Sequence, residues 1–139
     1  MPIINPRRPC SVLIVEDDFD SCDMVARYLS GAGHSVACAG NGREGLAALG
    51  RTMPDVIILD ANMPEVGGVA FLEALRADLR WAWVPVILLT GFDQGPHIER
   101  ARALGVHRVF LKASFQLTDL LACVDDLRAD PDPARGTEG

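Results

Sequence analysis

The sequence predicts a doubly wound α/β domain, with a parallel sheet covered by helices on both faces. Two observations lead to this prediction. Short aliphatic and β-branched runs alternate along the chain with segments whose apolar residues recur at helical spacing. Three of the runs are apolar at consecutive positions, which is typical of strands that are buried on both faces of a parallel sheet. Together they indicate five strand–helix units in series.

The strands are predicted from the five apolar runs. Pro85 stands near the start of the fourth run, where a missing backbone N–H is tolerated. The predicted strands cover residues 11–15, 35–39, 55–59, 84–89 and 108–111.

The helices are predicted from apolar positions between these runs. The second and fourth helices, over 42–50 and about 96–104, have the weaker patterns, and Gly31 and Gly33 end the first helix. The stripes of the other three helices are Cys22, Val25 and Leu29; Phe71, Leu72, Leu75 and Leu79; and Leu117, Leu120, Leu121, Val124 and Leu127.

Length and composition indicate one soluble globular domain. The chain has 139 residues, of which 49% are hydrophobic and 23% charged, and its net charge is −6. An acidic chain is a poor non-specific ligand for nucleic acid or anionic membranes. The sequence contains neither an apolar run of the ~20 residues that a membrane span needs nor an apolar stretch typical of a signal peptide. We therefore expect a cytoplasmic protein that binds neither nucleic acid nor membrane.

Both ends of the chain differ from the region between them. Residues 1–10 contain three prolines and no periodic pattern, and residues 129–139 are rich in small, polar and proline residues. We expect a flexible N-terminal arm over 1–10, a folded domain over 11–128 and a flexible tail over 129–139.

The four cysteines are widely spaced and, with the three histidines, form no zinc-binding pattern. In a cytoplasmic protein we expect them to be reduced thiols, mostly buried as small apolar residues. They are Cys10, Cys22, Cys38 and Cys123.

Chemically active side chains follow four of the predicted strands. Glu16 and Asp17 follow the first strand, Asp60 the third, Thr90 the fourth and Lys112 the fifth. In open parallel sheets the functional site lies beyond the carboxyl ends of the strands. We therefore expect these side chains to meet.

Three converging carboxylates repel one another, and a hard cation with oxygen ligands, such as Mg²⁺, relieves that repulsion. With Lys112, the metal would offset the charge of an incoming phosphoryl group, which Asp60 could accept as nucleophile while Thr90 bonds a phosphoryl oxygen. Each residue also has a simpler interpretation. Single carboxylates at strand ends and Lys112 are often only solvated charges, and Thr90 before Gly91 fits a turn. Asp18 or Asp20 fits a helix N-cap.

With this set of residues, the chain resembles the receiver domains of bacterial two-component response regulators. The resemblance covers about residues 10–128, and four segments carry it in the order and spacing of the family. These segments are VLIVEDD (12–18), PDVIILDANMPEVGG (54–68), VPVILLTG (84–91) and VFLK (109–112).

The resemblance implies a flavodoxin-like (βα)5 fold with strand order 2-1-3-4-5. It implies that Asp60 accepts phosphate from a phosphohistidine on a sensor histidine kinase or a histidine phosphotransfer protein. Glu16, Asp17 and Asp60, with the backbone carbonyl of Asn62, would hold Mg²⁺. Thr90 would be the switch hydroxyl, Lys112 the phosphoryl-contacting lysine and Gly68 the glycine after strand three. Such domains are regulatory phosphoacceptors that promote their own phosphorylation, and they signal through protein contacts or phosphate relay.

Two residues depart from the family pattern. Val109 stands where the family usually has an aromatic residue, and Ala113 stands where it usually has a proline after a cis peptide bond. A constitutive interaction module, which binds partners largely independently of phosphorylation, is therefore the alternative hypothesis.

Other classes fit less well. An aspartyl-phosphate phosphatase generally needs a second aspartate close after its nucleophile, and Ala61 and Asn62 stand there; no P-loop motif occurs. We expect a monomer or weak homodimer with an unidentified downstream protein target.

Overall fold

The computed structural model describes residues 9–61, 67–91 and 95–129 and contains the predicted five strands and five helices. All strand pairs are parallel, in the order β2-β1-β3-β4-β5. The predicted fold class and strand order are thus confirmed. The strands are β1 (Ser11–Val15), β2 (Ser35–Ala39), β3 (Val56–Asp60), β4 (Val86–Thr90) and β5 (Arg108–Leu111).

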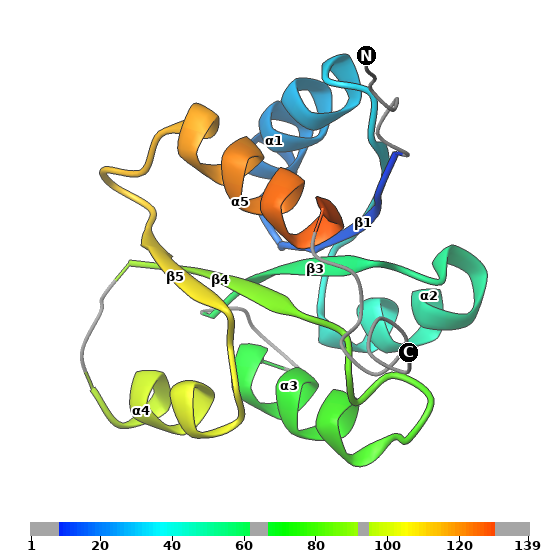
Figure 1. Ribbon diagram of the computed structural model, residues 1–139. Coiled ribbons are helices and arrows are strands. Elements are labelled where there is room, and N and C mark those ends of the chain that lie inside the picture. Colours follow the sequence, from blue (N-terminus) through cyan, green and yellow to red (C-terminus); the bar gives the residue numbers. More distant parts are fainter. Residues whose placement is uncertain (1–8, 62–66, 92–94, 130–139) are drawn as a thin grey trace.

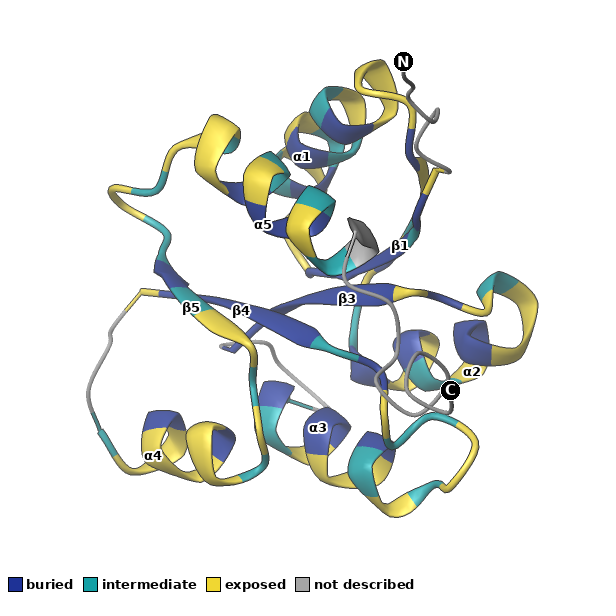
Figure 2. Ribbon diagram, in the orientation of Figure 1, coloured by how far each residue is buried: buried dark blue, intermediate teal, exposed yellow. Residues whose placement is uncertain are grey.

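The helices cover both faces of the sheet, as Figure 1 shows. One apolar cluster lies between the sheet and α1 and α5, and the other lies between the sheet and α2, α3 and α4. The central strands β1, β3 and β4 are largely buried between these layers (Figure 2). The helices are α1 (Phe19–Gly31), α2 (Gly42–Thr52), α3 (Gly68–Ala77), α4 (Pro96–Ala103) and α5 (Leu117–Ala129).

The third and fourth strands extend further than their apolar runs. Asp60 is the last residue of β3 and Thr90 the last of β4, although the sequence predicted ends at 59 and 89. Both side chains are almost completely buried, at 1% and 0% exposure. A strand predicted from apolar runs stops too early when the final buried residue is polar.

The start of α1 is fixed by Asp18. The Asp18 carboxylate accepts a hydrogen bond of 3.0 Å from the backbone N–H of Ser21, so Asp18 is the N-cap. The buried face of α1 is the predicted stripe of Cys22, Val25 and Leu29.

Leu79 was wrongly assigned to the buried stripe of the third helix. The helix ends at Ala77, and Leu79 is 92% exposed in the following loop. Arg76, in the last turn, explains the path of the chain, because its guanidinium donates hydrogen bonds to the carbonyls of Ala82 and Val84 at 3.0 and 2.7 Å. These bonds hold the α3–β4 loop against the helix end.

The cysteine prediction is wrong for two residues. Cys22 and Cys38 form a disulfide between α1 and β2, with 6.6 Å between their Cα atoms, and Cys38 is exposed rather than buried. Cys10 and Cys123 are buried thiols, as predicted. The pairing has no local sequence motif, because 16 residues separate the partners and only the packing of α1 beside edge strand β2 brings them together.

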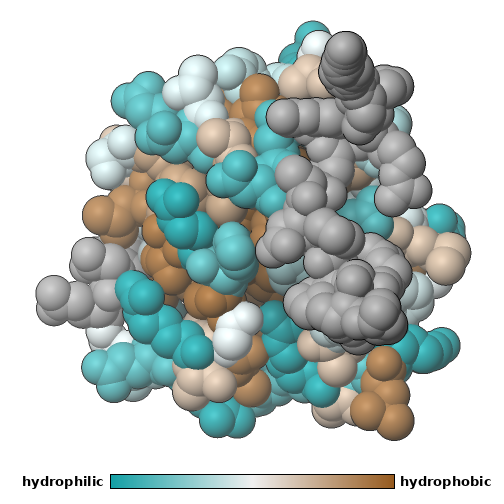
Figure 3. All heavy atoms as spheres, viewed as in Figure 1, coloured by the Kyte–Doolittle hydropathy of each residue, from teal (hydrophilic) through white to brown (hydrophobic). Residues whose placement is uncertain are grey.

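None of the helices in the described ranges is long and apolar enough to span a bilayer. Hydrophobic residues reach the surface between α4 and α5, where β5 lies (Figure 3). β5 forms one edge of the sheet, and its Val109 and Leu111 are only half buried.

Candidate phosphoacceptor site

The predicted site residues lie at one end of the sheet, where the carboxyl ends of β1, β3, β4 and β5 meet. Glu16 follows β1, Asp60 ends β3, Thr90 ends β4 and Lys112 follows β5. Hydrogen bonds between neighbouring segments fix these ends, since Glu16 N–H donates to Ala39 O at 3.0 Å and Lys112 N–H donates to Thr90 O at 2.8 Å. The sheet therefore holds the backbone of the site.

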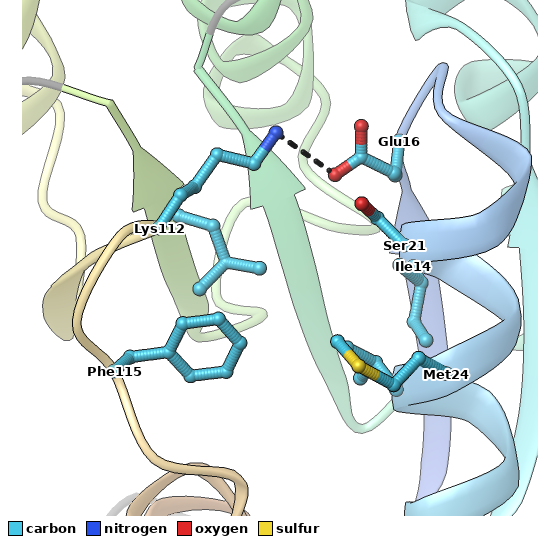
Figure 4. A pocket seen from close by; sticks show the side chains of 8 residues that line it. Ile14, Glu16, Ser21, Met24, Lys112 and Phe115 are labelled. Carbon is cyan, nitrogen blue, oxygen red and sulfur yellow. Dashed lines mark ion pairs between the residues drawn. The ribbon is translucent and has the colours of Figure 1, made fainter.

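The Lys112 ammonium lies between two buried carboxylates. Its Nζ is 3.2 Å from Glu16 Oε1 and 3.2 Å from Asp60 Oδ2. Figure 4 shows the Lys112 side chain reaching from the end of β5 towards Glu16. The lysine side chain is 33% exposed, whereas the carboxylate side chains are 3% and 1% exposed. One cation from the solvent side thus faces two anions beneath it.

Burial is the main reason that the pKa of Glu16 rises from its ordinary 4.5 to about 7. The Asp60 carboxylate raises it further, while the Asp18 N–H, 3.1 Å from Oε2, and the Lys112 ammonium lower it. Near neutral pH this carboxyl is therefore close to its midpoint.

Lys112 is subject to opposing effects. Burial lowers the pKa of its ammonium, but the charges of Asp60 and Glu16 and the hydrogen bonds to them outweigh burial and raise it. The lysine is therefore a firmly charged partner for anions at neutral pH.

Asp17 completes a group of three carboxylates. Glu16, Asp17 and Asp60 each offer an oxygen, and these oxygens lie within 4.8 Å of one another. Asp17 is exposed, so its carboxylate borders the solvent side of the group. The predicted fourth ligand, Asn62, lies outside the described residues.

The donor set fits a hard divalent cation. Glu16 Oε1 is buried and faces the Lys112 ammonium at 3.2 Å. With all three carboxyls ionised, their charge exceeds that of the single ammonium by two negative charges, and oxygen ligands suit Mg²⁺. The residues therefore match the predicted metal in charge and ligand type.

Comparisons with known proteins agree with this geometry. The family model described as "Response regulator receiver domain" matches residues 12–125. The chain belongs to the response regulator receiver domain family.

Solved receiver structures are similar over most of the chain. The chemotaxis protein CheY4 of Vibrio cholerae is 31% identical, with a TM-score of 0.78 over 86% of this chain and 98% of that one. A receiver domain of a signal transduction histidine kinase from Syntrophus aciditrophicus is 30% identical, with a TM-score of 0.79 over 86% and 90%. Receiver domains are the phosphoacceptors of two-component signalling.

Among curated sequences, the DNA-binding dual master transcriptional regulator RpaA of Synechocystis is 39% identical over 83 residues, which cover 60% of this chain and 34% of RpaA. The probable transcriptional regulatory protein TcrX of Mycobacterium tuberculosis is 36% identical over 86 residues, which cover 62% of this chain and 36% of TcrX. This chain thus spans about a third of the length of the curated relatives that it matches.

The two departures from the receiver pattern have defined surroundings. Val109 packs on the cluster beneath α2, α3 and α4, whereas Phe110 points to the opposite face and contacts Phe115 with 6.2 Å between ring centroids. The described residues contain no cis peptide bond, so the Lys112–Ala113 bond is trans. The receiver therefore has an aliphatic side chain at the position that usually carries the aromatic ring.

Sequence reasoning missed a pocket beside the site. Ser21 and Met24 of α1 line it on one side and Phe115 on the other, with Glu16 and Lys112 at one end (Figure 4). Nothing in the sequence marks these residues, because segments far apart in the chain form the pocket only after α1 and the β5–α5 loop have packed.

Gly68 was expected only from the family resemblance, and the structure gives a physical reason for it. A Cβ at this position would lie 2.7 Å from the Asp60 carbonyl oxygen and 2.8 Å from the Ala61 Cα. The start of α3 therefore lies directly against the backbone of the candidate phosphoacceptor.

Proposed function

We propose that this receiver accepts a phosphoryl group from a phosphohistidine onto Asp60 in a Mg²⁺-dependent reaction. The supporting observation is the buried Asp60 carboxylate, which lies 3.2 Å from the Lys112 ammonium and has carboxylate oxygens of Glu16 and Asp17 within 4.8 Å. A nucleophile, a cation and a metal-ligand set thus lie at one sheet edge.

In the proposed step, an Asp60 carboxylate oxygen attacks phosphorus and the bond from phosphorus to the donor imidazole nitrogen breaks. The electron pair of that bond stays on the imidazole. The Lys112 ammonium pairs with a phosphoryl oxygen, and the Thr90 hydroxyl donates a hydrogen bond to another.

Glu16, Asp17 and Asp60 would hold Mg²⁺, together with the Asn62 carbonyl. When bound, the metal would neutralise charge on the phosphoryl oxygens. The chain thereby promotes its own phosphorylation without turning over a separate substrate, and it acts as a regulatory domain.

For partners, we propose a sensor histidine kinase or histidine phosphotransfer protein in the cytoplasm and a downstream protein target. The net charge of −6 disfavours direct contact of this segment with nucleic acid. We propose a monomer or weak homodimer, with residues 11–128 as the functional unit.

The test is incubation with acetyl phosphate, with and without Mg²⁺, followed by intact-mass measurement. We expect one added phosphoryl group that requires Mg²⁺, is mapped to Asp60 and is absent from Asp60→Asn. An adduct that persists in Asp60→Asn would reject Asp60 as the acceptor. Equal partner affinity with and without the phosphoryl donor would instead support the constitutive interaction module.

A further inference from the structure

The Cys22–Cys38 disulfide joins the first turns of α1 to the carboxyl end of β2. Cys22 is 4% exposed, whereas Cys38 lies exposed on the edge strand of the sheet. Cys38 is thus the more exposed residue of the pair, which makes it the first to react with a dissolved thiol or disulfide. Cys22 is then the resolving residue.

Both cysteines are linked to Glu16 through short series of hydrogen bonds. On one side, Cys22 N–H donates to Asp18 O at 3.0 Å, and Asp18 N–H donates to Glu16 Oε2 at 3.1 Å. On the other side, Ala39, next to Cys38, accepts the Glu16 N–H at 3.0 Å. The disulfide thus closes a ring of contacts that includes Glu16.

From this ring we infer that Cys22 and Cys38 form a reversible dithiol–disulfide couple that regulates the metal affinity of the phosphoacceptor site. The inference rests on the proposed function, because it assigns Glu16 a role in holding Mg²⁺. In the disulfide form, α1 and β2 hold the backbone on both sides of Glu16 in a fixed relation. In the dithiol form, only hydrogen bonds and packing hold it.

The oxidant is a low-molecular-weight disulfide of the glutathione class. The Cys38 thiolate attacks one of its sulfurs and releases one thiol, which leaves a mixed disulfide on Cys38. The Cys22 thiolate then attacks the Cys38 sulfur and releases the second thiol. The pair loses two electrons and two protons, which leave with the two released thiols.

The test is a glutathione titration of the full chain, with and without Mg²⁺, read by alkylation and peptide mass at both cysteines. If the disulfide tightens Mg²⁺ binding, Mg²⁺ must favour the disulfide by the same factor, because coupling between two equilibria is reciprocal. We expect a reversible transition that Mg²⁺ shifts by about fivefold or more. We also expect slower amide exchange over residues 15–22 in the oxidised, metal-free protein.

The control variants are Cys38→Ala and Cys123→Ser. The exposed Cys38→Ala should bind Mg²⁺ like the reduced wild type under both oxidising and reducing conditions. Cys123→Ser should keep the redox response of the wild type. A pair that does not exchange with glutathione, or equal Mg²⁺ affinity in both redox states, would overturn the inference while leaving the proposed function intact. Absence of Mg²⁺ binding in both states would instead contradict the proposed function, and the inference with it.

Discussion

At the scale of single residues, Glu16 shows how burial sets the chemistry of the site. This carboxyl is almost fully buried beside Asp60, and its pKa is raised to about 7. Proton and metal therefore compete for the same group near neutral pH. We expect Mg²⁺ affinity to increase as pH rises through 7, which calorimetric titrations at several pH values would measure.

In the metal-free protein, the same carboxyl makes the free energy of unfolding decrease as pH rises. Because its folded pKa lies above its ordinary 4.5, the folded state binds more protons than the unfolded state between these two values. The stability that this carboxyl contributes is fully present below its ordinary pKa of 4.5 and is lost as pH rises through its folded-state pKa of about 7. Urea unfolding from pH about 5 to about 8 should show this loss in the wild type, and Glu16→Gln should flatten it. An unchanged slope in that variant would contradict the assignment.

Gly68 is the second residue with a direct test. Gly68→Ala places a methyl group 2.7 Å from the Asp60 carbonyl oxygen, and both backbones must shift to make room. We expect a stability loss of ~1–3 kcal/mol in urea unfolding, with slower phosphorylation by acetyl phosphate.

The matched control is Gly50→Ala in α2, where an added Cβ meets no atom within 4 Å. It should be neutral or stabilising by up to ~1 kcal/mol, since alanine favours helix. Equal effects of the two variants would mean that close approach to Asp60 is not the cause.

At the scale of elements, Arg76 joins the end of α3 to two connecting segments. Besides Ala82 and Val84, its guanidinium donates to the carbonyls of Leu104 and Gly105 after α4, at 2.8 and 2.9 Å. Arg76→Met keeps most of the apolar stem but leaves these carbonyls without their donor. We expect a loss of ~2–4 kcal/mol in urea unfolding.

Arg51→Met in α2 is the control for that variant. Arg51 is exposed, and it donates one long hydrogen bond of 3.4 Å to Ala47 O. Its loss should change stability by no more than ~0.5 kcal/mol. Similar losses in the two variants would show that the carbonyl contacts of Arg76 contribute little.

The elements were largely predictable because each depends on local pattern. Consecutive apolar residues predicted the strands, and the stripe through Val25 and Leu29 predicted the first helix. The errors occurred where contacts outside the segment decide the structure. Asp60 and Thr90 extend their strands because each pairs with a residue of the neighbouring strand. Leu79 is exposed because the helix ends at Ala77.

The candidate site was predictable to the extent that it follows from strand ends. The pairing of parallel strands brings Glu16, Asp60 and Lys112 together independently of the loop conformations. The Cys22–Cys38 bond and the pocket beside Met24 and Phe115 depend on how α1 and the β5–α5 loop pack, which no short motif encodes.

At the scale of the whole molecule, the site draws on four of the five strands, so its occupancy is coupled to global stability. A ligand that binds only the folded chain stabilises it by mass action, by ~2.7 kcal/mol at a hundred times its dissociation constant. We expect Mg²⁺ to raise the melting temperature of the wild type in proportion to the logarithm of its concentration.

The variant Asp60→Ala should lose most of that stabilisation, because it removes one of the three clustered carboxylates. Calcium-free buffers and a matched ionic strength of sodium chloride separate specific binding from general screening. An equal increase in melting temperature with the sodium salt would show that the cation is not bound at this site.

The hydrogen bond from Lys112 N–H to Thr90 O connects the main chains of two residues whose side chains would contact the same phosphoryl group. Because this bond joins the two main chains, we expect a displacement of Thr90 to be passed on to the backbone of Lys112. Because position 109 is a valine, it carries no aromatic ring that could move toward Thr90. We therefore expect the β4 and β5 termini to slide together as a unit, delivering the signal at the sheet rim as a translation of backbone.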